Sequence, residues 1–310
     1  MPNYSKDYLR AREMSLKELK RMEIIRDGDG RIEAGTGVEV IESVESGSSG
    51  VSGRPYVPWS VGCVRPLDSP LGATLREEDY VAISESVELQ AEEIVRCEVD
   101  CWYWRMNYVW TNDEHWVMKG KSGPYQRWPV ARETQVYCDM LFRYPRLGIP
   151  KARQRKITWL VSTQMLGDAL FTGGRLYMIQ SKREADAKKV LRRMHGVYER
   201  MRSVAPWLGP GLKRCGESEL VFTNDSVIMA VPQGANYVQS HTPAWWFADE
   251  AQLQDEIEEA YYQALPACER ITLAGTTDYG WFCQIFLRDD IDGSKGRVAT
   301  ESDEGSGIVV

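Results

Sequence analysis

Hydrophobic residues follow two spacings along the chain, and each spacing predicts a different kind of element. Short unbroken apolar runs, typical of strands buried on both faces of a parallel sheet, occur at 147–150, 175–181, 244–248 and 270–277. Apolar positions three or four residues apart predict helical structure at 76–104, 130–142, 157–170, 182–202 and 253–265. An Asn-Asp turn predicts a hairpin across 219–231. This alternation predicts an α/β fold whose mainly parallel sheet is flanked by helices.

One of these predicted strands runs directly into two acidic residues, Asp249 and Glu250. In an open α/β sheet, ligands bind at the carboxyl ends of the strands. A nucleotide site needs one carboxylate there to hold Mg²⁺ through its water shell and a second to polarise the attacking water. Asp249 is predicted for the first role and Glu250 for the second. The alternative is a buried strand whose acidic residues simply begin a helix, because Asp and Glu favour a helix's first turn.

A basic loop joins the first predicted strand to the helix that follows it. Such a junction holds phosphate oxygens through backbone N–H groups and the helix dipole. Against the phosphate-loop pattern Gly-x-x-x-x-Gly-Lys-Ser/Thr, Lys151 and Lys156 replace the glycines and Ile157 replaces the lysine. Thr158 still supplies a hydroxyl for Mg²⁺, and Lys151, Arg153 and Lys156 supply positive charge. A residue other than glycine at this tight turn must adopt a positive φ, or the loop must take another path.

Three further segments have both a functional and a structural interpretation. Gln135, near aromatic side chains, predicts an adenine pocket, whereas an exposed Gln on an amphipathic helix fits the spacing equally well. Thr276 or Thr277, beside the acidic strand, is predicted to contact the γ-phosphate or its water; alone, this Gly-Thr-Thr is a strand ending in a turn. The cations of the 182–202 helix suit DNA phosphates or a solvated face, since acidic residues are interspersed among them.

Composition narrows the class of protein. The 310 residues carry a net charge of -7, so contact with nucleic acid must come from a local patch. No run of 18 apolar residues and no signal-peptide core occur, which predicts a soluble, intracellular protein. Seven scattered cysteines argue against a disulfide framework, and Cys97, Cys101 and His115 leave a zinc site short of ligands. We predict an N-terminal extension over 1–75, a main domain over 76–288 and a tail over 289–310.

Taken together, the motif order from about 101 to 282 resembles the ATPase half of the large terminase subunits of tailed bacteriophages. The Lys-Ala-Arg-Gln-x-x-x-Thr loop is similar to the deviant Walker A form of that family, although family members usually carry glycine at the position of Lys156. The resemblance implies a P-loop NTPase fold of the additional-strand type that binds ATP and Mg²⁺. The phosphate loop would then comprise Lys151, Ala152, Arg153, Gln154, Arg155, Lys156, Ile157 and Thr158.

The same resemblance assigns a role to each candidate site residue. Lys151 and Arg153 would bind and sense phosphate, and Thr158 with Asp249 would hold Mg²⁺. Glu250 would activate water, and Gln135 would read adenine. The coupling motif would be Gly275, Thr276 and Thr277.

At the level of the whole assembly, the resemblance implies a DNA-packaging motor in the host cytoplasm. Its partners would be double-stranded DNA, the portal protein, the small terminase subunit and other copies of the chain in a ring, with no membrane. Full-length large terminases add an RNase H-like nuclease, and the short stretch after the coupling motif predicts none here. The alternatives are a helicase-like DNA-dependent ATPase and a non-catalytic assembly module with the same fold.

Overall fold

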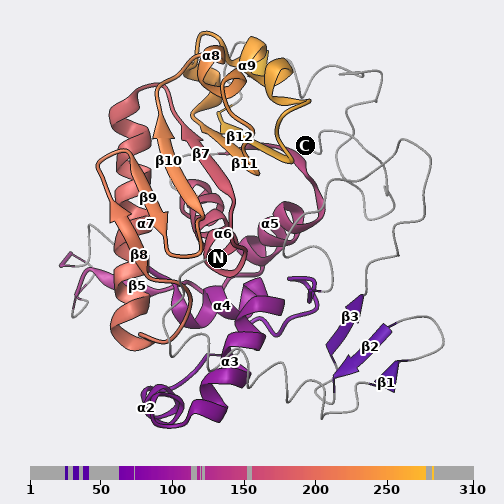
Figure 1. Cartoon of the computed structure of the whole chain (residues 1–310), viewed down its shortest axis with the longest axis vertical. Helices are drawn as coiled ribbons and strands as arrows, with labels where there is room; N and C mark the ends of the chain where they lie inside the picture. Colours follow the sequence, from indigo (N-terminus) through magenta and orange to yellow (C-terminus); the bar gives the residue numbers. More distant parts are fainter. Residues whose placement is uncertain are drawn as a thin grey trace. The chain divides into compact units, whose positions relative to one another are not determined.

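The chain divides into two compact units, formed by residues 1–142 with 196–211 and by 143–195 with 212–310. The computed structural model (Figure 1) describes residues 25–26, 31–34, 38–41, 63–72, 74–112, 117–118, 120, 123–151, 156–276 and 281–282. The predicted domain over 76–288 therefore contributes to both units. The predicted boundaries near 75 and 288 stay predictions, since most of the N-terminal extension and all of the tail lie outside the described residues.

A seven-stranded sheet forms the centre of the second unit. Its strands are β6 (Arg146–Pro150), β7 (Leu176–Gln180), β8 (Leu212–Cys215), β9 (Glu219–Phe222), β10 (Val227–Val231), β11 (Trp245–Asp249) and β12 (Arg270–Gly275). They lie in the order β6-β12-β11-β7-β10-β9-β8. The first five strands are parallel, β9 is antiparallel to β10, and the edge strand β8 is antiparallel to β9. Strand β12 lies between β6 and β11, which confirms the predicted additional-strand fold class.

The strand register brings the predicted site residues to one edge of the sheet. Every residue of β11 is buried, as its unbroken apolar run predicts. Asp249, its last residue, is paired with Ala274 on β12, and the next residue of β12, Gly275, is paired with Pro150 on β6. The carboxyl ends of three parallel strands therefore meet just before the basic loop begins.

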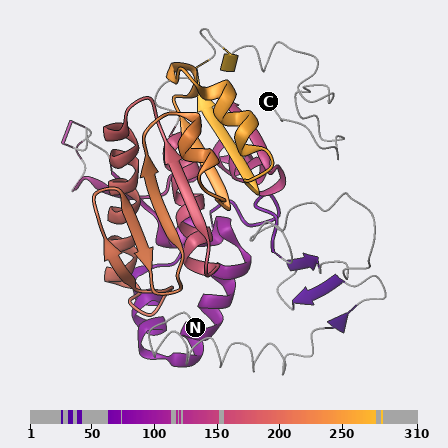
Figure 2. The ribbon, with the colours of Figure 1, turned by 45° about the horizontal axis from the view of Figure 1, so that its top comes forward.

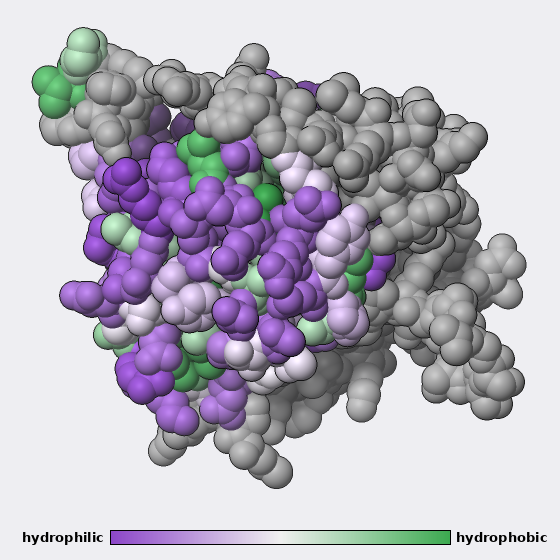
Figure 3. Space-filling model, turned by 90° about the horizontal axis from the view of Figure 1, so that it is seen from above, coloured by the Kyte–Doolittle hydropathy of each residue, from purple (hydrophilic) through white to green (hydrophobic). Residues whose placement is uncertain are grey.

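Helices cover both faces of this sheet. Helix α6 (Ile157–Phe171) is buried on nearly all sides and contacts β10, β11 and β12. On the other face, the core joins side chains of β11 and β12 to α8 (Ala235–Gln239) and α9 (Ile257–Ala264), which Figure 2 shows in front of the sheet. Figure 3, seen from above Figure 1, shows a largely hydrophilic described surface with small, separate apolar groups. No described helix is long and apolar enough to cross a membrane.

The first unit is mainly helical where it is described. Its elements include α2 (Glu77–Glu85), α3 (Val87–Val99), α4 (Cys101–Tyr108), β4 (Trp110–Asn112), β5 (Tyr125–Arg127) and α5 (Arg132–Arg143), and α7 (Glu184–Val204) spans both units. The N-terminal strands β1 (Ile25–Arg26), β2 (Arg31–Ala34) and β3 (Val38–Ile41) form a separate antiparallel sheet.

The helical pattern predicted over 76–104 is divided into three helices by two capping residues. Ser86 accepts a hydrogen bond from the Leu89 amide, and Asp100 accepts one from the Tyr103 amide. These side chains satisfy backbone donors that have no partner inside a helix, so each starts a new one.

Six of the seven cysteines lie in the part of the chain that the structure describes. No disulfide joins the six described cysteines, and no cluster of three or more His, Cys, Asp or Glu side chains gathers there to hold a metal. His115 and Cys283 lie outside this part of the chain.

Asp168, on α6, is a buried carboxyl group whose titration should affect stability. The Tyr177 hydroxyl donates to its Oδ2 at 3.0 Å. Burial raises the pKa of Asp168 from 3.8 to about 6, and the positive charges of Arg270 and Arg175 oppose that shift only in part. The folded protein therefore holds this proton more tightly than the unfolded chain. The resulting stabilisation is present below pH 4 and is lost as the pH rises through about 6.

We expect Asp168→Asn to remove this pH dependence, because an amide does not titrate in this range. Between pH 4 and pH 7, the free energy of unfolding of the wild type should fall relative to that of the variant by up to about 3 kcal/mol. Urea unfolding followed by circular dichroism at several pH values measures this difference. Parallel pH profiles for the two proteins would contradict the prediction.

Candidate nucleotide-binding site

The backbone ties the start of the basic loop to the end of β12. The Lys151 amide donates to the Gly275 carbonyl at 2.8 Å, which extends the pairing of β6 with β12 by one residue. Lys151 is thereby held at the carboxyl edge of the sheet, beside the end of β11. The residues that follow it, Ala152, Arg153, Gln154 and Arg155, lie outside the described residues, and their predicted phosphate contacts stay predictions.

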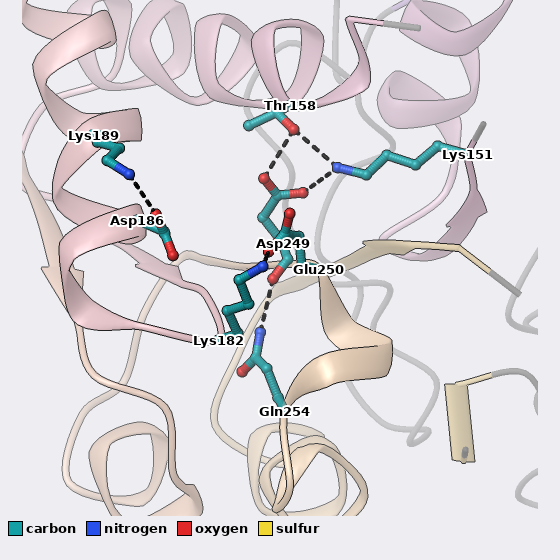
Figure 4. Close-up of polar contacts among 8 residues, drawn as sticks. All are labelled: Lys151, Thr158, Lys182, Asp186, Lys189, Asp249, Glu250 and Gln254. Carbon is teal, nitrogen blue, oxygen red and sulfur yellow. Dashed lines mark hydrogen bonds and ion pairs between the residues drawn. The ribbon is translucent and has the colours of Figure 1, made fainter. Parts of the chain in front are cut away.

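Three predicted site residues meet at this edge, as Figure 4 shows. The Lys151 Nζ atom forms an ion pair with Asp249 Oδ1 and donates to Thr158 Oγ1 at 3.0 Å. The Thr158 hydroxyl donates to Asp249 Oδ2 at 2.8 Å. Only 16% of the Lys151 side chain and 10% of the Asp249 side chain are exposed, so little water screens the pair. A cation, a hydroxyl and a carboxylate from three separate segments therefore share one small volume.

The spacing of Thr158 and Asp249 suits a magnesium site. Magnesium binds oxygen at about 2.0–2.1 Å in an octahedron, which puts two adjacent ligands about 2.9 Å apart. The 2.8 Å between Thr158 Oγ1 and Asp249 Oδ2 is close to that value. Hydroxyl and carboxylate oxygens are also the hard ligands that this ion prefers. The donor set therefore fits Mg²⁺, either directly or through its water shell.

Lys156, immediately before α6, adopts a positive φ, which is one of the two alternatives predicted for a residue other than glycine at this turn. Its φ is 58° and its ψ is 17°, a left-handed conformation that glycine adopts without steric cost. The loop therefore keeps a helix N-terminus directed at the site although a lysine replaces the glycine that is usual in the resembled family.

We expect Lys156→Gly to raise the free energy of unfolding by up to about 1 kcal/mol. Glycine relieves the strain of the left-handed conformation, and this gain exceeds the cost of the greater conformational entropy that glycine gives the unfolded chain. Lys156→Ala is the matched control, because it removes the same side chain but keeps a Cβ in the left-handed conformation. Urea unfolding of the two variants measures the difference. An alanine variant as stable as the glycine variant would contradict the prediction.

Glu250, the predicted water-activating residue, turns away from Asp249. Its φ is 52°, a left-handed conformation, and its carboxylate Oε2 lies 2.8 Å from Lys182 Nζ. Lys182 follows β7, the strand paired with β11 on the side away from β12. The sequence placed Lys182 among the cations of the long helix and missed this pairing. The position of Lys182 just after a predicted strand could have indicated that it lies at the carboxyl edge of the sheet. The sequence did not show that this strand is the neighbour of β11.

A buried glutamine fixes the turn that carries the two acids. The Gln254 side-chain Nε2 donates to the Asp249 carbonyl at 2.9 Å, and only 5% of Gln254 is exposed. A 3-10 helix, η1 (Ala251–Leu253), lies between them. The backbone direction after β11 is therefore set by a contact that the sequence analysis did not predict.

The predicted coupling motif is only partly described. Gly275 is buried at the end of β12 and Thr276 is half-buried, while Thr277 lies outside the described residues. Through its carbonyl, Gly275 contacts the first residue of the basic loop. The contact with a γ-phosphate stays a prediction.

Gln135, the predicted adenine reader, is fully buried in the first unit. Its Nε2 donates to the carbonyls of Pro66 and Ser69 at 2.7 and 2.8 Å, and its Oε1 accepts from Arg132 at 2.6 Å. The amide thus holds the 66–69 segment against α5. Gln135 and the phosphate site belong to different units, so the adenine role stays a prediction.

The basic helix α7 is partly neutralised by its own acidic residues. Lys188 pairs with Glu184 at 2.7 Å and Lys189 with Asp186 at 2.8 Å, the second pair being drawn in Figure 4. Arg183 and Arg192 are exposed on the same helical segment. The contact of α7 with DNA phosphates stays a prediction.

The chain is similar to large terminases of bacteriophages, the family that its motif order resembles. The HK97 large terminase matches at 12% identity and a TM-score of 0.40, over 49% of this chain and 34% of that one. The large terminase of a thermophilic bacteriophage matches at 13% and 0.37, over 48% and 39%. The large terminase ATPase domain of Thermus phage P74-26 matches at 14% and 0.41, over 59% and 76%.

These likenesses are partial. The match spans about a third of the HK97 protein and two fifths of the large terminase from the thermophilic bacteriophage. No family model and no curated protein matches the chain.

Proposed function

We propose that this chain is the ATP-hydrolysing motor subunit of a phage DNA-packaging terminase. The observation that carries the proposal is the meeting of Lys151, Thr158 and Asp249 at the carboxyl edge of an additional-strand sheet. Asp249 is 91 residues away from Thr158 in the sequence, so the contact is a product of the fold rather than of local structure. A cation, a hydroxyl and a carboxylate in this position are what a magnesium-bound triphosphate requires.

The proposed roles follow from the contacts. Thr158 and Asp249 would hold Mg²⁺, which when bound neutralises phosphate oxygens and orients the reacting group. The Lys151 ammonium group, held close to both, would bind a phosphate oxygen, and Arg153 would add a second positive charge during the reaction. Gln135 would read the adenine edge, which requires its amide to exchange its present bonds to the Pro66 and Ser69 carbonyls for adenine. Gly275, Thr276 and Thr277 would pass the state of the γ-phosphate to the rest of the chain.

Glu250 would orient and polarise the water that attacks the γ-phosphate. Its ion pair with Lys182 leaves 37% of its side chain exposed, so the side chain is accessible to water at the edge of the sheet. The two acids at the end of β11 would thus have separate roles, with Asp249 contacting the Thr158 hydroxyl on α6 and Glu250 contacting Lys182 just after β7.

The motor would act on double-stranded DNA at the portal protein of a prohead, in the host cytoplasm, together with a small terminase subunit. Several copies would form a ring around the DNA. The proposed DNA-phosphate contacts are exposed cations such as Arg183, just before α7, and Arg192, on α7. A DNA contact of this kind should weaken steeply as the salt concentration rises.

A second candidate is a non-catalytic assembly module with the same fold. Two observations favour it: Lys156 stands where the turn favours glycine, and Lys182 occupies an oxygen of Glu250. A helicase-like DNA-dependent ATPase is a further alternative, which a strand-separation assay distinguishes from a translocating motor.

The proposal is tested by measuring phosphate release from ATP by the purified chain in magnesium buffer, with and without double-stranded DNA. The Glu250→Gln variant serves as the inactive control. A motor hydrolyses ATP faster with DNA present, whereas a non-catalytic module shows the same background rate as the control. Adding portal protein and the small subunit then tests the proposed partners.

A further inference from the structure

Gln252 carries a buried polar atom that the roles proposed above do not use. It lies on η1, two residues after Glu250. Its side-chain oxygen Oε1 is buried, and no described residue donates a hydrogen bond to it. Buried acceptors are nearly always paired in folded proteins, so an exception needs an explanation.

The carboxamide of Gln252 lies directly on Gly275, the last residue of β12. A Cβ atom at position 275 would overlap Gln252 Oε1 and would lie 3.1 Å from Phe282 Cε1 and 3.2 Å from Gln252 Cδ. The amide therefore occupies the space that a side chain at 275 would take. Glycine leaves this space for the amide because it has no side chain. Its backbone conformation does not require glycine, since the φ of Gly275 is not positive.

Gly275 links this contact to the phosphate loop. Its carbonyl accepts the Lys151 amide at 2.8 Å, and Lys151 Nζ contacts Thr158 and Asp249. A displacement of Gly275 would therefore move the residue proposed to bind phosphate.

The other side of the contact is tied equally closely to the acidic pair. The Leu253 amide donates to the Glu250 carbonyl at 2.9 Å, and Gln254 holds the Asp249 carbonyl. The short turn from Asp249 to Gln254 is therefore closed by two hydrogen bonds of its own. Among the described side chains of this turn, that of Gln252 lies nearest to the space beside Gly275.

We propose that Gln252 is a positioning residue that couples the acidic turn after β11 to the coupling motif at the end of β12. The inference rests on the proposed ATPase function and extends it. Seated on Gly275, the amide transmits a shift of Glu250 to Gly275 and Thr276, and the reverse. The unpartnered Gln252 oxygen favours a rearrangement in which it gains a hydrogen-bond donor. The contact between Gln252 and Gly275 is therefore suited to change between nucleotide states.

Three variants test this coupling. Gln252→Ala removes the amide, and Gln252→Met keeps the length of the side chain but removes its polar atoms. Gly275→Ala places a Cβ where the amide lies. Gln239→Ala, an exposed glutamine on α8 of the same unit, is the matched control.

We expect Gln252→Ala and Gln252→Met to reduce the stimulation of ATP hydrolysis by DNA about tenfold, a coupling change in the usual range for a single contact. The affinity for Mg-ATP and the rate without DNA should stay within about twofold of the wild type. A purely structural role would lower these quantities together, so the split identifies coupling. The Gln239→Ala control should behave as the wild type.

The double variant Gln252→Ala/Gly275→Ala provides the second readout. If the two residues act through their contact, the loss of DNA stimulation in the double variant is smaller than the product of the two single losses, because the alanine at 275 then has no amide to displace and meets only Phe282. Losses that multiply in the double variant overturn the proposal, and so does full DNA stimulation in Gln252→Ala. If the wild type itself shows no stimulation by DNA, the proposed motor function fails, and the coupling role falls with it.

Discussion

Glu250→Gln should bind Mg-ATP within about twofold of the wild type and lose turnover by roughly 10²–10⁴-fold, the contribution of a positioned general base. Glutamine has the shape of glutamate and still offers an oxygen to Lys182, so the local structure should persist. What it lacks is the negative charge that polarises the attacking water. The substitution therefore separates binding from chemistry.

Phosphate release under single-turnover conditions and binding of a fluorescent ATP analogue measure the two effects separately. Glu258→Gln, an exposed glutamate on α9, is the matched control and should hydrolyse ATP at the wild-type rate. Near-normal turnover in Glu250→Gln would remove Glu250 from the catalytic role. It would also favour the view that this edge of the sheet has a structural rather than a chemical purpose.

Asp249→Ala should weaken binding of Mg-ATP by roughly 10–100-fold, the usual cost of losing a group that orients a metal's ligands. The loss should disappear in EDTA, because the carboxylate acts only through the metal. Affinity for metal-free ATP should even rise, since Lys151 is then released from its ion pair with Asp249. Isothermal titration calorimetry with and without Mg²⁺ measures both affinities.

Removing one partner of a nearly buried ion pair also destabilises the fold, so Asp249→Ala needs a companion variant. Asp249→Asn keeps an oxygen for the Thr158 hydroxyl while removing the charge. It should show the same magnesium dependence with a smaller loss of unfolding free energy. Full magnesium-dependent affinity in both variants would show that Asp249 does not hold the metal.

Much of the chain's organisation was determined by the sequence alone. The apolar run before Asp249 predicted a strand buried on both faces, and β11 is buried at every position. At the turn before α6 the sequence left two alternatives, a positive φ or another path of the loop, and Lys156 adopts the positive φ. The breaks between α2, α3 and α4 were also recorded locally, in the capping residues Ser86 and Asp100, although periodicity alone did not reveal them. All of these features depend on residues a few positions apart, where burial and backbone preference leave a pattern.

Only the tertiary structure decided which distant segments meet. Nothing in the apolar run of β12 says that it inserts between β6 and β11, because any buried strand offers the same pattern to either neighbour. The ion pair of Glu250 with Lys182 and the seat of Gln252 on Gly275 follow from that strand order. Gln135 is a further case, since its amide is satisfied by the 66–69 backbone rather than exposed on a helix face. Side chains brought together by packing leave no periodic mark in the sequence, so their partners became known only once the sheet was assembled.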